Sequence, residues 1–213
     1  MVLQMLNLRR AHFGDGVQAL DCGANIGVHT VEWARMMTGW GTVVGIEAQE
    51  RIYYALAGNI AINNCLNARV LHAAVGGVEG VIEVPDLDYT SPSSFGSLEI
   101  KQRSEGSEFI GQAVDYAAGP KTSVNLVTID GLGFERLDLI KLDVEGMEIE
   151  ALNGGLETIK TFWPMMLVEV IKTEDGAVDA FLKDLGYRTF RVGINILAIH
   201  ESDPSLENVQ ITE

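Results

Sequence analysis

The sequence has few cysteines and no long apolar run. Its two cysteines, Cys22 and Cys65, are too few for a disulfide framework or a zinc site, so we expect both to be small buried side chains. No apolar run approaches the ~20 residues of a membrane-spanning helix. The apolar stretch of residues 1–10 is too short for a signal peptide, and its charges follow it rather than precede it. We therefore expect a soluble, cytoplasmic protein with no membrane partner.

Basic residues are also scarce. Lys and Arg number 15 against 30 Asp and Glu, which gives a formal net charge of −15, and their one cluster is Arg9–Arg10. A nucleic-acid partner requires a basic surface that displaces counterions from phosphates. The composition therefore argues against DNA or RNA as a partner.

The length of 213 residues and the hydrophobic fraction of 47% predict one α/β domain with an ordinary core, spanning residues 1–213. We expect residues 1–16 to be a short N-terminal extension and residues 86–123 to be an irregular insertion. Short β-branched runs alternate with helical stretches at the start of the chain. This order predicts a parallel sheet with right-handed crossovers and helices on both faces. The predicted strands are 17–21, 42–47 and 68–75, and the helices between them are 27–37 and 51–64.

The second half repeats the alternation and ends differently. Strands are predicted at 137–143 and 164–171, helices at 147–161 and 177–185, and an antiparallel hairpin at 188–192 and 195–200. The fold class is therefore α/β, with about seven strands in a mostly parallel sheet that closes on a C-terminal antiparallel hairpin. Between the halves, residues 80–85 favour an extra strand and regular structure returns at 124–129. The polar stretch 101–121 is too long for a simple connection.

A glycine-rich turn follows the first predicted strand, with the sequence DCGANIG at residues 21–27. Such a strand-to-helix turn brings the backbone close to a ligand at the carboxyl edge of a parallel sheet. A dinucleotide needs the pattern G-x-G-x-x-G. If Gly23 is the first of these glycines, Asn25 and Val28 occupy the other two places. Two of the three glycines that the pattern requires are therefore missing, and Asp21 would bring a carboxylate close to the pyrophosphate.

S-adenosylmethionine suits the same turn better than a dinucleotide does. It carries no phosphate, and it has an ammonium, a sulfonium and a carboxylate. Asp21 favours the positive groups, while the amides of the loop, with Gly23, Asn25 and Gly27, are free to take the carboxylate. The turn therefore indicates a cofactor site for S-adenosylmethionine.

Two further segments extend this cofactor site. Glu47 ends the second predicted strand, 26 positions after Asp21, and an acid there accepts hydrogen bonds from both ribose hydroxyls. The third strand ends in His72, Ala73 and Ala74. Ala74 offers apolar contact to an adenine, and we assign no chemical role to His72.

These motifs together resemble a known family. The segment LDCGANIGVHT is similar to the first motif of the FkbM-type methyltransferases, and DLIKLDVEGMEIEALNGGLETI followed by WPMMLVEV is similar to the second half of that family. The resemblance covers residues 17–200. It implies a class I methyltransferase (Rossmann-like) fold and methyl transfer from S-adenosylmethionine, commonly to a hydroxyl on a sugar, a polyketide or another small metabolite.

The resemblance also implies site residues and shows two departures. The residues that would line the cofactor are Asp21, Gly23, Asn25, Gly27 and Glu47. Cys22 stands where such sequences often have an aliphatic residue. The segment before the first strand is short, whereas many relatives have more helix there to cover the site.

The sequence KLDVEG at residues 141–146 contains three catalytic candidates, Lys141, Asp143 and Glu145. Lys141 and Asp143 lie on one face of the predicted strand because side chains alternate with period two. Charged groups at the end of an apolar strand are costly unless they are paired or functional. Asp143 is a candidate general base for a substrate hydroxyl, or the group that orients it. In the structural alternative, Lys141 pairs with an acid and Glu145 caps the next helix.

Other readings of the same residues stay open. Asp143, Glu145 and Glu169 could together hold a divalent metal through oxygen ligands. Residues 91–97 (SPSSFGS) either help to cover the site or form an ordinary surface loop. The chain as a whole could be a nucleotide-dependent oxidoreductase or a non-catalytic binding module, and a homodimer is compatible with either. For a methyltransferase we expect a small-molecule or glycan acceptor.

Overall fold

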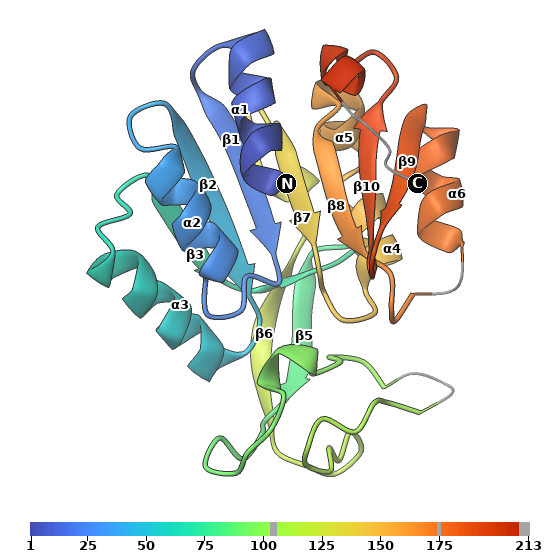
Figure 1. Cartoon of the computed structure of the whole chain (residues 1–213). Helices are drawn as coiled ribbons and strands as arrows, with labels where there is room; N and C mark the ends of the chain where they lie inside the picture. The colour runs from blue at the N-terminus through green and yellow to red at the C-terminus, as the bar shows by residue number, and fades with distance from the viewer. Residues whose placement is uncertain (103–105, 174–175, 209–213) are drawn as a thin grey trace.

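A computed structural model describes residues 1–102, 106–173 and 176–208 of the chain. Its centre is a seven-stranded sheet in the order β3-β2-β1-β7-β8-β10-β9 (Figure 1). The strands from β3 to β8 pair in parallel, and β10 pairs antiparallel with both neighbours. This confirms the predicted fold class, including the closing hairpin. The strands are β1 (Val17–Cys22), β2 (Gly41–Glu47), β3 (Ala68–His72), β7 (Leu139–Leu142), β8 (Met165–Glu169), β9 (Tyr187–Val192) and β10 (Asn195–His200).

Helices cover both faces of this sheet (Figure 1). One face carries α1 (Val2–Phe13), α2 (Val28–Met36) and α3 (Glu50–Ile62), and the other carries α4 (Glu148–Asn153), α5 (Leu156–Phe162) and α6 (Ala177–Asp184). Consecutive residues of a strand pack into different hydrophobic cores, one on each face of the sheet, because their side chains alternate. Ala19 packs with Trp33 on the first face, and Leu20 packs with Leu152 on the second. Cys22 and Cys65 are buried free thiols, as expected.

A second sheet of three strands, in the order β4-β6-β5, was not predicted. It contains β4 (Ala74–Val75), β5 (Gly80–Pro85) and β6 (Lys121–Val127). The single strand predicted at 68–75 is therefore wrong. Its partner β2 ends at Glu47, whose carbonyl accepts the Ala73 N–H at 3.1 Å. Beyond that point the chain finds its backbone partners in β6, where Ala74 lies opposite Leu126.

The helix predicted at 147–161 is interrupted between α4 and α5. A Cβ on Gly154 would lie 2.2 Å from the carbonyl oxygen of Gly76, and one on Gly155 would lie 3.0 Å from Cβ of Ile129. The two glycines let the chain pass close to the second sheet, and the helix breaks there.

The N-terminal residues form the helix α1, where the sequence predicted only a short extension. Leu6 is fully buried, and so is most of Arg9. The Arg9 guanidinium binds Asp138 at 3.1 Å and Asp203 at 2.6 Å. Asp138 precedes β7, and Asp203 precedes the 3-10 helix η3 (Pro204–Asn208), so one buried cation joins both ends of the chain to the sheet. No helix in the described ranges is long and apolar enough to cross a membrane.

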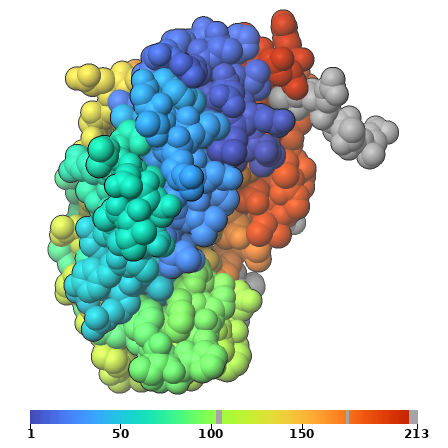
Figure 2. Space-filling view, turned by 60° about the vertical axis from the view of Figure 1, so that its left-hand side comes forward, coloured from blue at the N-terminus to red at the C-terminus, as the bar shows by residue number. Residues whose placement is uncertain are grey.

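Residues 86–102 and 106–120, here called the cover segment, connect β5 to β6. The segment is irregular apart from the 3-10 turn η1 (Phe95–Ser97), but the irregular stretch predicted at 86–123 ends earlier, because β6 begins at Lys121. A small core of its own holds Leu87, Leu98 and Ile110 against the second sheet. The segment lies beyond the carboxyl ends of β1, β2 and β7, and Figure 2 shows its green part packed below α3.

Candidate active site

A cavity opens at the carboxyl ends of β1, β2 and β7, between the strand ends and the cover segment. Its space, including the open mouth, is about 560 Å³. It is lined by six of the predicted residues, namely Gly23, Asn25, Glu47, Ala74, Asp143 and Glu145. The structure thus brings together residues that are up to 122 positions apart in the sequence (Gly23 and Glu145).

Gly23 sits where the β1–α2 loop crosses the end of β7. Its φ is +74°, and a Cβ there would lie 1.7 Å from the Asp143 carbonyl oxygen. The Asp143 N–H in turn donates to the Cys22 carbonyl at 3.1 Å. Glycine is therefore required both by the left-handed backbone and by the close approach of the two chain segments.

Glu47 joins the two loops on either side of the cavity. Its side chain is 6% exposed. One carboxylate oxygen accepts the Asn25 N–H at 2.9 Å, and the other accepts the Gln49 N–H at 2.8 Å. Burial raises the pKa of Glu47 to about 6, against the opposing effect of these backbone hydrogen bonds.

Asp21 and Gly27 lie behind the cavity and do not line it. Asp21 is 1% exposed; it accepts the Thr30 hydroxyl at 2.6 Å and faces the Lys141 ammonium at 3.6 Å. A Cβ on Gly27, whose φ is +89°, would lie 2.6 Å from Leu56 of α3. Both residues shape the turn from behind, which differs from the predicted direct lining of the cofactor.

The wall formed by Ala73, Ala74 and Val75 is apolar. His72 is not among the residues that line this cavity. Its ring stacks on Tyr53 with centroids 5.1 Å apart and makes a 3.0 Å hydrogen bond with the Ala48 carbonyl. The chain switches sheets directly after His72, so the small side chains that follow it are the ones that border the cavity.

Lys141 and Asp143 lie on one face of the strand end, as predicted, with Nζ and Oδ2 2.9 Å apart. Burial lowers the pKa of Lys141, but Asp21 and Asp143 outweigh it and raise that pKa above its usual value. Lys141 therefore stays charged under the site. It also borders a second hollow, beside the β1–α2 loop, that shares Gly23, Asn25 and Asp143 with the cavity.

Glu145 does not cap the following helix. Its φ is +54°, and its carboxylate binds the Lys172 ammonium at 2.6 Å. Burial raises the pKa of Glu145 despite this partner. Glu148, the first residue of α4, points back into the preceding turn, where its Oε1 accepts the N–H groups of Val144 and Gly146, each at 3.2 Å. Glu148 thus fixes the turn that presents Asp143 and Glu145.

Lys172 and Gln49 are site residues that the sequence analysis missed. The Lys172 ammonium donates to the Ser97 carbonyl at 2.8 Å and pairs with Glu108 of the cover segment at 3.3 Å. Gln49 lines the cavity and donates to the Phe95 carbonyl at 2.7 Å. These two side chains hold residues 91–97 against the site, which favours the covering role over an ordinary loop. A lone basic residue just after a strand end was the one available signal for Lys172.

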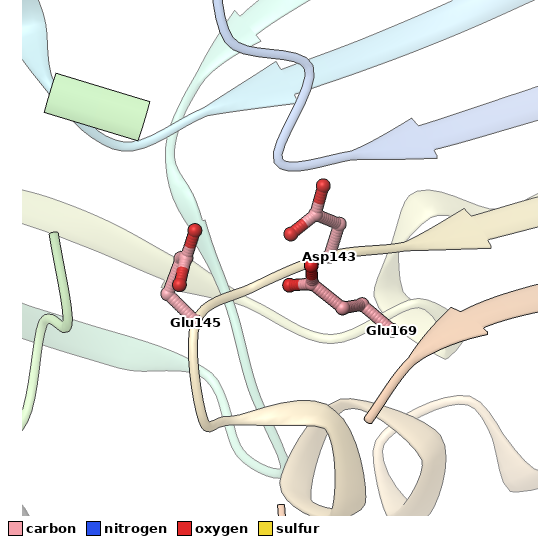
Figure 3. Close-up of side chains that lie close together, drawn as sticks. All are labelled: Asp143, Glu145 and Glu169. Atoms are coloured by element: carbon pink, nitrogen blue, oxygen red, sulfur yellow. The ribbon is translucent and has the colours of Figure 1, made fainter. Parts of the chain in front are cut away.

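The carboxylates of Asp143, Glu145 and Glu169 converge at this edge of the sheet (Figure 3). One oxygen from each lies within 4.8 Å of the others. Lys141 already binds Asp143, and Lys172 already binds Glu145. A divalent cation would compete with both ammonium groups for these carboxylates, so the donor set fits a metal poorly. Metal binding stays an untested prediction.

Comparison with known proteins agrees with this geometry. A sequence profile described as the methyltransferase FkbM domain matches residues 21–189. Methyltransferase sdnD of Sordaria araneosa is 26% identical over 193 residues, which cover 79% of this chain and 72% of that protein.

Solved structures show the same fold. The crystal structure of methyltransferase FkbM from Methylobacillus flagellatus superposes with a TM-score of 0.59 at 15% identity, covering 91% of this chain and 48% of that one. This chain therefore spans about half the length of that relative. The methyltransferase domain of METTL16 superposes with a TM-score of 0.51 at 12% identity, covering 95% of this chain and 66% of that one. The sheet order and these neighbours define a class I methyltransferase fold, and the match over residues 21–189 places the chain in the FkbM methyltransferase family.

Proposed function

We propose that this protein transfers a methyl group from S-adenosylmethionine to a hydroxyl oxygen of a small molecule or glycan. One observation carries the proposal. A single cavity has the buried carboxylate of Glu47 at one strand end and the partly exposed carboxylate of Asp143 at another. The first is placed for a ribose and the second for the reacting hydroxyl.

The lining fits a sulfonium cofactor better than a phosphate-bearing one. No lysine or arginine is among the described residues that line the cavity, so a pyrophosphate would meet carboxylates there without a cation. Glu47 uses one lone pair on each oxygen for a backbone N–H, and a carboxylate oxygen has a second one for a ribose hydroxyl. The Ala73–Ala74 wall suits the apolar face of an adenine. The same lining argues against the oxidoreductase reading.

The reaction asks the protein mainly for alignment. The cofactor supplies a methyl group on a sulfonium, which is already an activated leaving group. The chain must hold the acceptor oxygen in line and remove its proton. Asp143 is the group placed for that proton, because Lys141 binds its Oδ2 and leaves the other carboxylate oxygen for the hydroxyl.

The second hollow offers the acceptor a place beside Asp143. Its lining includes Ile26 of the β1–α2 loop and Val28 at the start of α2, which are 42% and 67% exposed. Apolar side chains at the rim with a carboxylate at the base suit an acceptor that has an apolar face and a free hydroxyl. A sugar face or a polyketide chain meets this description.

The proposal is tested by calorimetric titration with S-adenosylhomocysteine. We expect saturable binding to the wild-type protein. Glu47→Gln should bind at least about tenfold more weakly, because the amide group turns a donor toward one of the two backbone N–H groups that the carboxylate accepted. Glu135→Gln, at an exposed position away from the cavity, is the matched control and should bind like the wild type.

Other outcomes separate the alternatives. No binding of S-adenosylhomocysteine to the wild type would refute the proposed cofactor, and binding of a reduced nicotinamide dinucleotide instead would support the oxidoreductase. Incubation with methyl-labelled S-adenosylmethionine and a panel of sugars and polyketides then tests the acceptor. Cofactor binding with no labelled product from any hydroxyl acceptor would favour a non-catalytic module.

A further inference from the structure

The register of two neighbouring strands forces Asp143 and Glu169 together. Leu142 of β7 lies opposite Val168 of β8 in a parallel pair, so the next residues, Asp143 and Glu169, follow side by side. Adjacent strands are about 4.8 Å apart, and residues in register on them point to the same face. Carboxyl oxygens of the two side chains accordingly lie within 4.8 Å of each other, and Figure 3 shows both groups at the adjacent ends of β7 and β8.

The two neighbouring lysines, Lys141 and Lys172, form ion pairs with other carboxylates. Lys141, below the pair, binds Asp143 at 2.9 Å and faces Asp21 at 3.6 Å. Lys172, beside the pair, is bound to Glu145. Among the ion pairs of the described residues, none includes Glu169.

The other charged groups near Glu169 are acids. Asp143 comes from the end of β7, Glu145 from the turn after it and Glu148 from the start of α4. On its other side Glu169 lies opposite Asn195 of β10, which is uncharged. Two carboxylates at this separation cannot both be ionised cheaply in a half-buried site.

We propose that Asp143 and Glu169 form a carboxyl pair that shares one proton, held on Glu169, and that Glu169 is a positioning residue for Asp143. The proposal rests on the proposed function and deepens it. The Glu169 carboxyl donates its hydrogen bond to one Asp143 oxygen. Asp143 then stays the only anion of the pair, oriented by Lys141 and by Glu169.

The electrostatics of the site support this charge state. Burial, the hydrogen bond to Asp143 and the charges of Asp143, Glu145 and Glu148 raise the pKa of Glu169 to about 8. At neutral pH its carboxyl therefore keeps the proton.

The pair has a defined part in the transfer. The acceptor oxygen forms its bond to the methyl carbon while the bond from that carbon to sulfur breaks, and the electron pair of the broken bond goes to sulfur. The hydroxyl proton passes to the free lone pair of Asp143. Glu169 keeps its own proton throughout and holds the Asp143 carboxylate in one orientation, so it acts through Asp143 and does not touch the acceptor.

The test is a carbon NMR titration of the protein labelled at the glutamate side-chain carboxyl carbon. In the wild type we expect one glutamate resonance with a midpoint near pH 8. It should be missing in Glu169→Gln and present in Glu135→Gln, which assigns it. Asp143→Asn should lower the midpoint by about one unit or more, because it removes the nearest negative charge.

Three results would overturn the proposal. The first is a Glu169 midpoint at the ordinary glutamate value in the wild type. The second is a midpoint that Asp143→Asn leaves unchanged. The third is displacement of the proton by MgCl2 added at a concentration equal to the protein, which would mean that a cation bridges the carboxylates. Because no cofactor is present, these outcomes are independent of S-adenosylhomocysteine binding, and failure of the pair is distinguishable from failure of the proposed function.

Discussion

Replacing Gly23 by alanine tests whether the close approach of the β1–α2 loop to β7 builds the site. The substitution has two costs. The left-handed backbone, with φ +74°, is strained by roughly 1–2 kcal/mol for a residue with a Cβ. The new Cβ would also lie 1.7 Å from the carbonyl oxygen and 2.8 Å from the carbonyl carbon of Asp143. Both atoms are backbone and cannot rotate away, and such overpacking adds roughly 1–3 kcal/mol.

Gly39→Ala is the matched control for this substitution. Gly39 has φ +83° and nothing within 4 Å of its added Cβ, so it carries the backbone strain without the clash. In urea unfolding we expect Gly23→Ala to lose roughly 1–3 kcal/mol more than Gly39→Ala. In a protein of this size each 1 kcal/mol lowers the melting temperature by about 2–4 °C.

The same pair of variants separates stability from function. Relief of the clash must move the Asp143 backbone, so Gly23→Ala should weaken S-adenosylhomocysteine binding at a temperature where the variant is still folded, while Gly39→Ala should not. Equal losses of stability in the two variants, with unchanged binding in both, would refute the close approach of the two segments.

Three further predictions use the buried charges. Folding raises the pKa of Glu47 from 4.5 to about 6, so the folded state binds this proton more tightly than the unfolded state does. In urea titrations, the unfolding free energy of the wild type relative to Glu47→Gln should therefore fall by about 2 kcal/mol as the pH rises from 4.5 through 6. Lys172→Met should cost about 3 kcal/mol or more by urea unfolding, since it leaves the largely buried carboxylate of Glu145 without its cation; Lys101→Met, which breaks an exposed pair, should cost less than about 1 kcal/mol. Arg9→Met should cost about 3–5 kcal/mol in the same assay because buried Asp203 loses its cation, and buried Asp138, which keeps Arg136, loses one of two, whereas Arg10→Met, at an exposed pair, should have a small effect; similar losses at the two arginines would contradict that reasoning.

The parallel sheet was predictable because its signals are local. Each strand is a short apolar run, and the helices after α1 have apolar residues at helical spacing, so the order of those elements and the closing hairpin follow from periodicity. The errors occur where distant segments decide the outcome. The strand predicted at 68–75 breaks because β2 ends at Glu47 and offers no further partner. The helix predicted at 147–161 breaks because Gly154 and Gly155 pack against another element.

In the site, too, the residues with a local sequence signal could be predicted, and those that depend on distant contacts could not. Glu47 and Asp143 could be found from the sequence, because an acid at the end of an apolar strand is conspicuous and the ends of parallel strands meet at one edge of the sheet. The cover segment and its attachments could not. Lys172 reaches Ser97 across 75 positions, and Gln49 reaches Phe95 across 46. No local pattern encodes either contact, since each depends on how the connection between β5 and β6 returns over the cavity.

Asp21 shows how burial changes the role that a motif residue receives. An aspartate at the start of a glycine-rich turn was expected to face the cofactor, yet the structure places it 1% exposed behind the loop, bound to Thr30 and facing Lys141. There its charge keeps Lys141 protonated, and Lys141 in turn binds Asp143 at 2.9 Å. Asp21 therefore acts on Asp143 indirectly, through the charged Lys141 that lies between them. Lys141 faces Asp21 and binds Asp143, and no ion pair of the described residues joins it to Glu169. In the pair that we propose, this arrangement favours the protonated form of Glu169.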